Sequence, residues 1–181
     1  MTTTDDEIVA RTRHWLEAAV IGLNLCPFAK PVYAKEQIRY AVSGAETPEE
    51  LLRELIDELW DLAAADPAVI ETTLLIHPAV LTDFLEYNDF FIVADAAIDD
   101  LELRGILQIA SFHPEYQFAG TAPNDIENYT NRSPYPMLHL LREASVERAV
   151  QSIPDPAEIY EKNIATLRRL GLKGWRRLIS S

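Results

Sequence analysis

The sequence contains little of what marks a secreted, membrane-bound or nucleic-acid-binding protein. Its 181 residues include one cysteine, which excludes an internal disulfide and a cysteine-rich structural zinc site. Asp and Glu number 29 against 16 Lys and Arg, so the formal net charge is −13, which suits neither nucleic-acid phosphates nor anionic lipid. The apolar stretch at 18–29 is too short to cross a bilayer, and the first residues, MTTTDDE, are too acidic for a signal peptide. We therefore expect a cytoplasmic protein with no membrane and no nucleic-acid partner.

Familiar catalytic patterns are also absent. The chain contains no GxGxxG or GxxxxGK(S/T) phosphate-binding loop, no HExxH pattern, no GxSxG nucleophile elbow and no CxxC pair. These absences exclude the commonest nucleotide-binding, zinc-protease and serine-hydrolase signatures. Any chemistry has to come from less regular clusters of residues.

What the sequence does contain is the apolar content and patterning of a globular domain, since 48% of its residues are hydrophobic. Thr4-x-x-Glu7 and Thr47-Pro48-Glu49-Glu50 are typical of helix starts, and β-branched apolar runs ending at Gly or Pro predict strands. The patterns predict helices over residues 5–23, 47–65, 83–101, 133–150 and 155–170, and strands over 36–43, 69–77 and 105–113. Residues 86–95 would also fit a strand. Residues 115–133 form a long irregular segment, a kind that is often functional.

Strands separated by helices favour an α/β fold with a small parallel or mixed sheet of about three strands, layered with helices and followed by extra C-terminal helices. An α+β sandwich is the neighbouring possibility. We expect one domain over residues 1–160 and a basic helix end and tail over 161–181. Residues 162–181 hold six Lys and Arg and no Asp or Glu, whereas the 161 residues before them hold ten Lys and Arg and all 29 acidic residues. A basic arm of this kind can complement its own helix dipole or lie on the acidic body. In the alternative it makes a weak contact with a nucleic acid or another partner through Arg176, Arg177 and Trp175.

Two histidines follow two of the predicted strands. Leu74-Leu75-Ile76-His77-Pro78 and Ala110-Ser111-Phe112-His113-Pro114 each end an apolar run with His-Pro. If the strands are parallel neighbours, both imidazoles lie at one edge of the sheet, where ligands collect in α/β folds and where neutral imidazole can bind a metal or move protons. In the alternative, both histidines simply finish buried strands and bond to turn carbonyls.

Cys26 is the third candidate for this site. It follows the first predicted helix and could serve as a thiolate nucleophile activated by His77 or His113. It could also be the third ligand of an open site for a divalent metal such as zinc. A single cysteine is most often a small buried hydrophobic residue, and this alternative stays open.

The segment around Arg132 supplies candidate substrate-binding residues. Arg132 precedes the helix predicted from Ser133, whose free N–H groups would favour an anion, so the two together could hold a carboxylate or phosphate. Tyr129, Asn131 and Glu115 are further candidates from the same irregular segment. Pairing of Arg132 with a surface carboxylate is an equally good interpretation. Two other histidines are left outside the site: His14, which could pair with Glu17 at the surface, and His139, which fits a satisfied core position.

Four blocks of the sequence resemble a known family. GLNLCPFAKP (22–31), LLIHP (74–78), SFHPEYQFAGTAP (111–123) and NYTNRSPYPMLHLLRE (128–143) look like the signature blocks of the uncharacterised bacterial family known as domain of unknown function 1415. The resemblance covers roughly residues 8–153 and supplies no catalytic residues. It implies a bacterial cytosolic protein whose distinctive blocks coincide with the candidate residues above.

The leading hypothesis is a small cytosolic enzyme, a hydrolase or group transferase on a small anionic substrate. Cys26, His77 and His113 would carry its chemistry and Arg132 would clamp the substrate. The alternative is a non-catalytic module that binds a small ligand or a partner protein in the same cleft. In a third interpretation these residues serve packing alone. The sequence predicts neither the substrate nor the oligomeric state.

Overall fold

A computed structural model describes residues 3–153, 155 and 157–180 and has a mixed α/β fold. Its sheet has four strands in the order β1-β2-β4-β3. Strands β1 and β2 are parallel, and β4 runs antiparallel to both β2 and β3. The strands are β1 (Ile38–Val42), β2 (Thr72–Ile76), β3 (Leu107–Phe112) and β4 (Met137–Arg142). The fold class predicted from the sequence is confirmed, with a strand that the sequence did not predict.

That strand is β4, and it lies within the helix predicted over residues 133–150. Only its second part is helical, as α5 (Glu143–Gln151). The run MLHLLR contains unbranched residues with good helix propensity, so its local preference was misleading. Pairing on both sides overrides that preference: Leu140 lies opposite Thr73 of β2 and opposite Ile109 of β3. Because β4 separates β2 from β3, these two strands are parallel in direction but are not neighbours, contrary to the expectation.

Helices α3 (Pro48–Ala64) and α4 (Phe84–Asp100) cover one face of the sheet. Thr47 forms the predicted capping box with Glu50, and the Asp83 carboxylate accepts from the N–H groups of Leu85 and Glu86. Leu51, Leu55 and their neighbours on α3 pack against Leu75, Leu138 and Leu140 of the strands. Residues 86–95, for which a strand was the alternative, lie within α4 and are helical.

The other face is covered by α1 (Asp5–Trp15), the π-helix η1 (Leu16–Ile21) and α2 (Ala29–Ala34). The predicted helix over 5–23 is present, but its second half is wound more widely. The N–H groups of Gly22 and Leu25 donate to carbonyls five residues back, at 3.0 and 2.9 Å. A Cβ at Gly22 would collide with the Ala18 carbonyl oxygen, so this close turn requires glycine.

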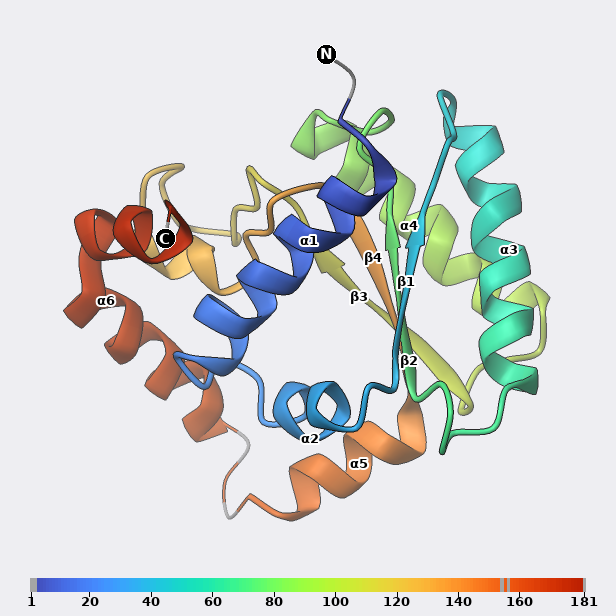
Figure 1. Ribbon diagram of the computed structural model, residues 1–181. Helices are drawn as coiled ribbons and strands as arrows, with labels where there is room; N and C mark the ends of the chain where they lie inside the picture. The colour runs from blue at the N-terminus through green and yellow to red at the C-terminus, as the bar shows by residue number, and fades with distance from the viewer. Residues whose placement is uncertain (1–2, 154, 156, 181) are drawn as a thin grey trace.

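The C-terminal helix α6 (Ala157–Ser180) is longer than predicted and lies outside α1 (Figure 1). It is interrupted at Gly171, whose φ of 65° and ψ of 171° are non-helical, one residue after the predicted end. Leu167 and Trp175, on either side of this kink, are buried against the α1 layer. The helix runs across the predicted boundary at 160/161. Pro156, part of the predicted cap of this helix, lies outside the described residues, whereas Asp155 Oδ1 accepts from Ala157 N–H at 3.0 Å.

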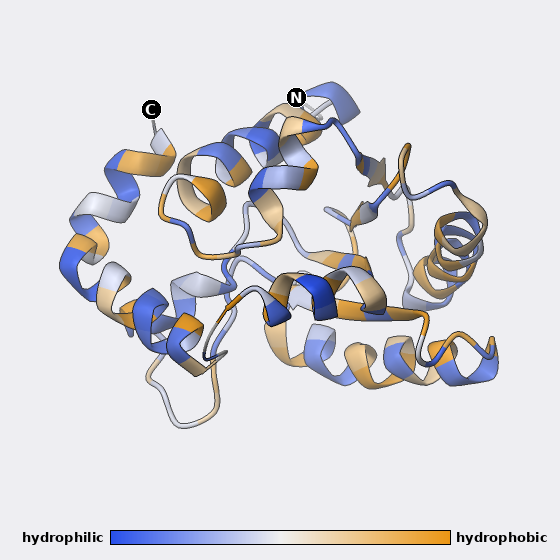
Figure 2. Ribbon diagram, turned by 90° about the horizontal axis from the view of Figure 1, so that it is seen from below, coloured by the Kyte–Doolittle hydropathy of each residue, from blue (hydrophilic) through white to orange (hydrophobic). Residues whose placement is uncertain are grey.

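The molecule thus has helices on both faces of a small sheet. In Figure 1, α1 passes in front of the sheet and α4 lies behind it. Figure 2 shows hydrophobic ribbon where the strands run between the helices. The short helix η2 (Ile126–Thr130) is the one regular element in the segment between β3 and β4. No helix in the described ranges is long and apolar enough to cross a membrane.

Candidate binding groove

His77 and His113 both follow strands, as predicted, and both side chains are completely buried. His77 Nδ1–H donates to the Val80 carbonyl at 2.9 Å. His113 Nδ1 accepts from the N–H of Glu115 at 3.0 Å, and its Nε2–H donates to the Leu81 carbonyl at 3.1 Å. Both rings therefore hold the turns that follow their strands, and both nitrogens of His113 are engaged.

Tyr87 of α4, a residue that the sequence did not single out, lies between the two imidazoles. Its ring centroid is 5.8 Å from that of His77 and 5.0 Å from that of His113. Its hydroxyl donates to Met137 O at 2.8 Å and accepts from Phe112 N–H at 3.1 Å. Burial lowers the pKa of His77 to about 4 and also lowers that of His113. Both rings are therefore neutral at pH 7 and belong to a buried network that joins β2, β3, β4 and α4.

Cys26 does not join these histidines. It packs with the α1 layer, whereas Tyr87 belongs to the core under α3 and α4. Side chains alternate along a strand, so His77 follows Leu75 toward α4 while Leu74 and Ile76 face α1. The sheet therefore separates Cys26 from both histidines, and the three do not form one shared site. The described residues contain no group of three or more His, Cys, Asp or Glu side chains that could hold a metal ion.

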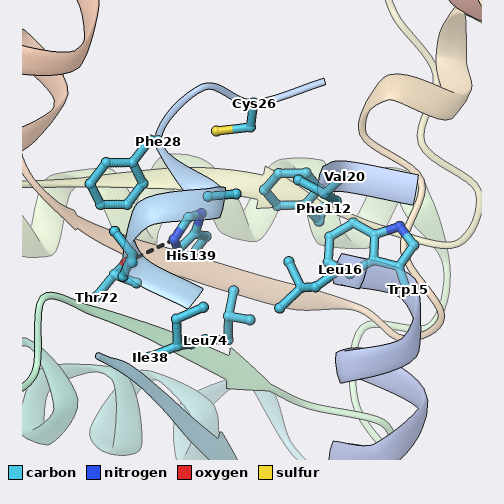
Figure 3. A pocket seen from close by; sticks show the side chains of 12 residues that line it. Trp15, Leu16, Val20, Cys26, Phe28, Ile38, Thr72, Leu74, Phe112 and His139 are labelled. Carbon is cyan, nitrogen blue, oxygen red and sulfur yellow. Dashed lines mark hydrogen bonds between the residues drawn. The ribbon is translucent and has the colours of Figure 1, made fainter. Parts of the chain in front are cut away.

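Cys26 instead lines a small cavity beside His139, shown in Figure 3. Burial raises the pKa of its thiol, although hydrogen bonds from the backbone of Phe28 and Ala29 act in the opposite direction. A buried thiol with a raised pKa is protonated at pH 7, which does not favour a nucleophilic role.

Arg132 is held by the irregular segment itself. Its Nε–H donates to Tyr116 O at 3.1 Å, one Nη–H donates to Pro123 O at 2.6 Å, and the guanidinium lies 4.4 Å from the centre of the Tyr129 ring. The helix that was predicted to help Arg132 bind an anion does not exist. Ser133 precedes a strand, because the chain leaves Pro136 extended to pair with β2 and β3.

The other candidate substrate-binding residues are close to Arg132 in the chain but have different environments. Asn131 fastens the end of β3: its Nδ2–H donates to Ser111 O at 3.0 Å, and its carbonyl accepts from His113 N–H at 3.2 Å. The Tyr129 ring meets Trp175 of α6 edge to face at 5.1 Å. Glu115 is exposed. Asn128, which is fully buried, orders this segment through bonds to Phe118, Thr121 and Ala122.

Arg132 and Tyr129 line a hollow that sequence reasoning did not find. It has a volume of about 140 Å³, and a larger hollow of about 530 Å³ shares Trp15, Pro134 and Ile179 with it. We call the two together the α1–α6 groove. Its lining residues come from α1, the segment before β4, and α6 beyond Gly171: Ala10, Arg11, His14, Trp15, Pro114, Tyr129, Arg132, Ser133, Pro134, Trp175, Ile179 and Ser180.

The groove is basic and aromatic on a strongly acidic chain. Arg11 is exposed and Arg132 is half-buried. Among the described residues, neither arginine forms a salt bridge with a carboxylate. His14 Nε2 is buried and has no hydrogen-bond partner in the described part of the chain. Its predicted partner, Glu17, accepts a hydrogen bond from Tyr33. None of the described lining residues is Asp or Glu.

The profile of one protein family matches residues 7–177 of the chain. This match extends beyond residue 153, where the resemblance was expected to end, and includes most of the basic C-terminal segment. Neither the curated proteins nor the solved structures contain a match to the chain. The chain belongs to the family described as protein of unknown function (DUF1415).

Proposed function

We propose that the protein is a cytoplasmic binding module that holds a small anionic molecule with a flat apolar body in the α1–α6 groove. The observation that carries this proposal is the composition of the groove wall. Arg11, Arg132 and His14 line it and none of its described lining residues is Asp or Glu, although the chain has a net charge of −13. A local cluster of one charge sign against the overall charge favours a ligand of the opposite sign.

The geometry of Arg132 supports an anion more than a cation or a neutral ligand. Two carbonyls and the Tyr129 ring fix the guanidinium, so little rotational freedom is lost when a ligand binds. A guanidinium has five N–H donors, and the two carbonyl bonds use two of them. The remaining donors can bond to a carboxylate or a phosphate. Trp15 and Trp175 supply apolar surface for the body of the ligand.

Binding is favoured over the predicted hydrolase or transferase activity. That activity requires Cys26, His77 and His113 in one site, and the sheet separates them. The Ser133 hydroxyl in the groove donates its proton to the Tyr135 carbonyl at 2.6 Å instead of to a histidine base. The residues of the groove are thus arranged to hold a ligand rather than to attack one.

We expect the protein to bind phenyl phosphate and benzoate, and to bind benzamide, which has the shape of benzoate without its charge, at least fivefold more weakly. Arg11→Gln should weaken phenyl phosphate binding about fivefold, the effect of removing one partly solvated charge-assisted hydrogen bond. Arg11→Lys should restore most of the affinity. The measurement is calorimetric titration, together with the fluorescence of Trp15 and Trp175.

The matched control is Arg53→Gln, which removes an exposed arginine from α3 on the opposite side of the sheet. This variant should bind phenyl phosphate within twofold of the wild type. Equal affinity for benzamide and benzoate, or an equal effect of the two arginine substitutions, would contradict the proposal.

A further inference from the structure

A second cavity lies on the α1 side of the sheet, under η1 and α2. Its volume is about 40 Å³, several times the 10–15 Å³, roughly, that one water molecule requires. It therefore has room for a molecule of a few non-hydrogen atoms. We call it the His139 cavity, and its wall is shown in Figure 3: Trp15, Leu16, Val20, Cys26, Phe28, Ala29, Val32, Ile38, Thr72, Leu74, Phe112 and His139.

The hydrogen bonds of Thr72 determine which nitrogen of His139 carries the proton. The Thr72 hydroxyl donates to the carbonyl of Leu140, because a carbonyl oxygen can only accept. The same hydroxyl lies 2.8 Å from His139 Nε2 and must therefore accept from it. Nε2 is consequently protonated, and Nδ1 is an acceptor.

This Nδ1 acceptor has no hydrogen-bond partner among the described residues. Figure 3 shows one ring nitrogen joined to Thr72 and the other directed away from it, toward the side on which Cys26 lies. The other polar groups of the wall are the Cys26 thiol, the Thr72 hydroxyl and the Trp15 indole N–H, and its remaining side chains are apolar. No donor from the described part of the chain reaches this acceptor, so a ligand that donates to it gains a hydrogen bond inside an apolar cavity.

Both titratable groups of the cavity are uncharged at pH 7. Burial lowers the pKa of His139 to about 4 and raises that of Cys26. A charged ligand would lose its hydration without gaining an opposite charge, so the cavity selects against ions. In this respect it differs from the α1–α6 groove, with which it shares Trp15.

We propose that the His139 cavity is a second binding site, for a small uncharged molecule with an apolar body and a single hydroxyl or N–H group that donates to His139 Nδ1. This site is separate from the groove and does not depend on the function proposed for it. The ligand is held by apolar contacts with the wall and by one hydrogen bond, which decides its orientation.

The test compares two probes of equal size, 2-propanol and acetone, which both have four non-hydrogen atoms. Only 2-propanol can donate a hydrogen bond. We expect 2-propanol to shift the amide NMR signals around Cys26, Thr72 and His139 in a saturable way with a millimolar Kd. Acetone should bind about tenfold more weakly, the usual effect of one missing hydrogen bond. Shifts that do not saturate would show that the cavity holds only water. Equal Kd values for the two probes would show that no hydrogen bond to His139 Nδ1 contributes to binding. Either result overturns the proposal.

Two variants separate the cavity from the hydrogen bond. His139→Leu removes the acceptor, so both probes should then bind with Kd values within twofold of each other. Ala29→Leu fills the cavity and should abolish the binding of both probes, while phenyl phosphate still binds in the groove. Retention of 2-propanol binding in Ala29→Leu would overturn the proposal, and so would retention of the tenfold preference in His139→Leu. The comparison of probes on the wild type remains decisive if a variant does not fold.

Discussion

The free energy of unfolding is expected to fall by about 6 kcal/mol as the pH decreases from about 6.5 to about 4. Burial lowers the pKa of both His77 and His139 to about 4 in the folded protein. An unfolded histidine has a pKa of about 6.5. Above pH 6.5 both states are neutral, and below pH 4 both are protonated. Between these limits only the unfolded chain binds the protons, so protonation favours unfolding.

The expected slope is about 1.4 kcal/mol per pH unit for each histidine. His113, whose pKa is also lowered by burial, acts in the same direction. A total of about 6 kcal/mol is comparable with the whole stability of a typical domain, so the protein should unfold in mild acid. The measurement is urea denaturation at several pH values between 7.5 and 5, a range over which about 4 kcal/mol of this fall is expected. In this range, carboxyl groups with lowered pKa values, such as those of Glu50 and Asp99, remain ionised.

His139→Gln provides the control, because glutamine can retain polar contacts but does not titrate. This variant should lose about 1.4 kcal/mol per pH unit of the dependence while keeping the part due to His77. A wild-type stability that stays constant between pH 7 and pH 5 would show that the buried rings are not held neutral.

Elements with strong local signals could be predicted from the sequence. The capping residues Thr4 and Thr47 begin helices where expected, and the apolar runs before His77 and His113 form strands. Strand β4 could not be found in this way, because the preference of Leu138 and Leu140 for a helix is overcome only by partners more than 25 residues away. The predicted Cys26–His77–His113 site required all three side chains to lie on the same side of the sheet. The face on which a strand residue lies depends on the register of the strands, which local sequence patterns do not fix.

The groove shows a second limit of sequence reasoning. Arg11 and Arg132 are more than 100 residues apart in the sequence, and Arg132 and Trp175 are about 40 residues apart. No local pattern therefore connects the three. The signals that pointed toward it were indirect: the long segment before β4 and the basic C-terminal helix, which both contribute to its wall. Arg132 and Tyr129 were selected as ligand-binding residues from that segment, and their place in the groove supports this interpretation as part of the proposed function.

Tyr87→Phe is expected to destabilise the protein by about 2–4 kcal/mol at pH 7.5. The ring and its packing between His77 and His113 are retained, so the effect comes from the hydroxyl alone. Its removal leaves the Met137 carbonyl without its donor and the Phe112 N–H without its acceptor, both in a buried region between neighbouring strands. An unpaired buried polar group costs about 1–3 kcal/mol, and two are created here.

Tyr160→Phe is the matched control, since Tyr160 lies on α6 and is 52% exposed. The same loss of one oxygen atom should there change the free energy of unfolding by less than about 0.5 kcal/mol. Denaturation of both variants at pH 7.5, where the histidines are neutral in both states, isolates the hydroxyl from the titration of the rings. If the two substitutions have equal effects, Tyr87 only fills space between the two histidines. A difference of several kcal/mol instead identifies its hydroxyl as the group that joins α4 to the ends of β3 and β4.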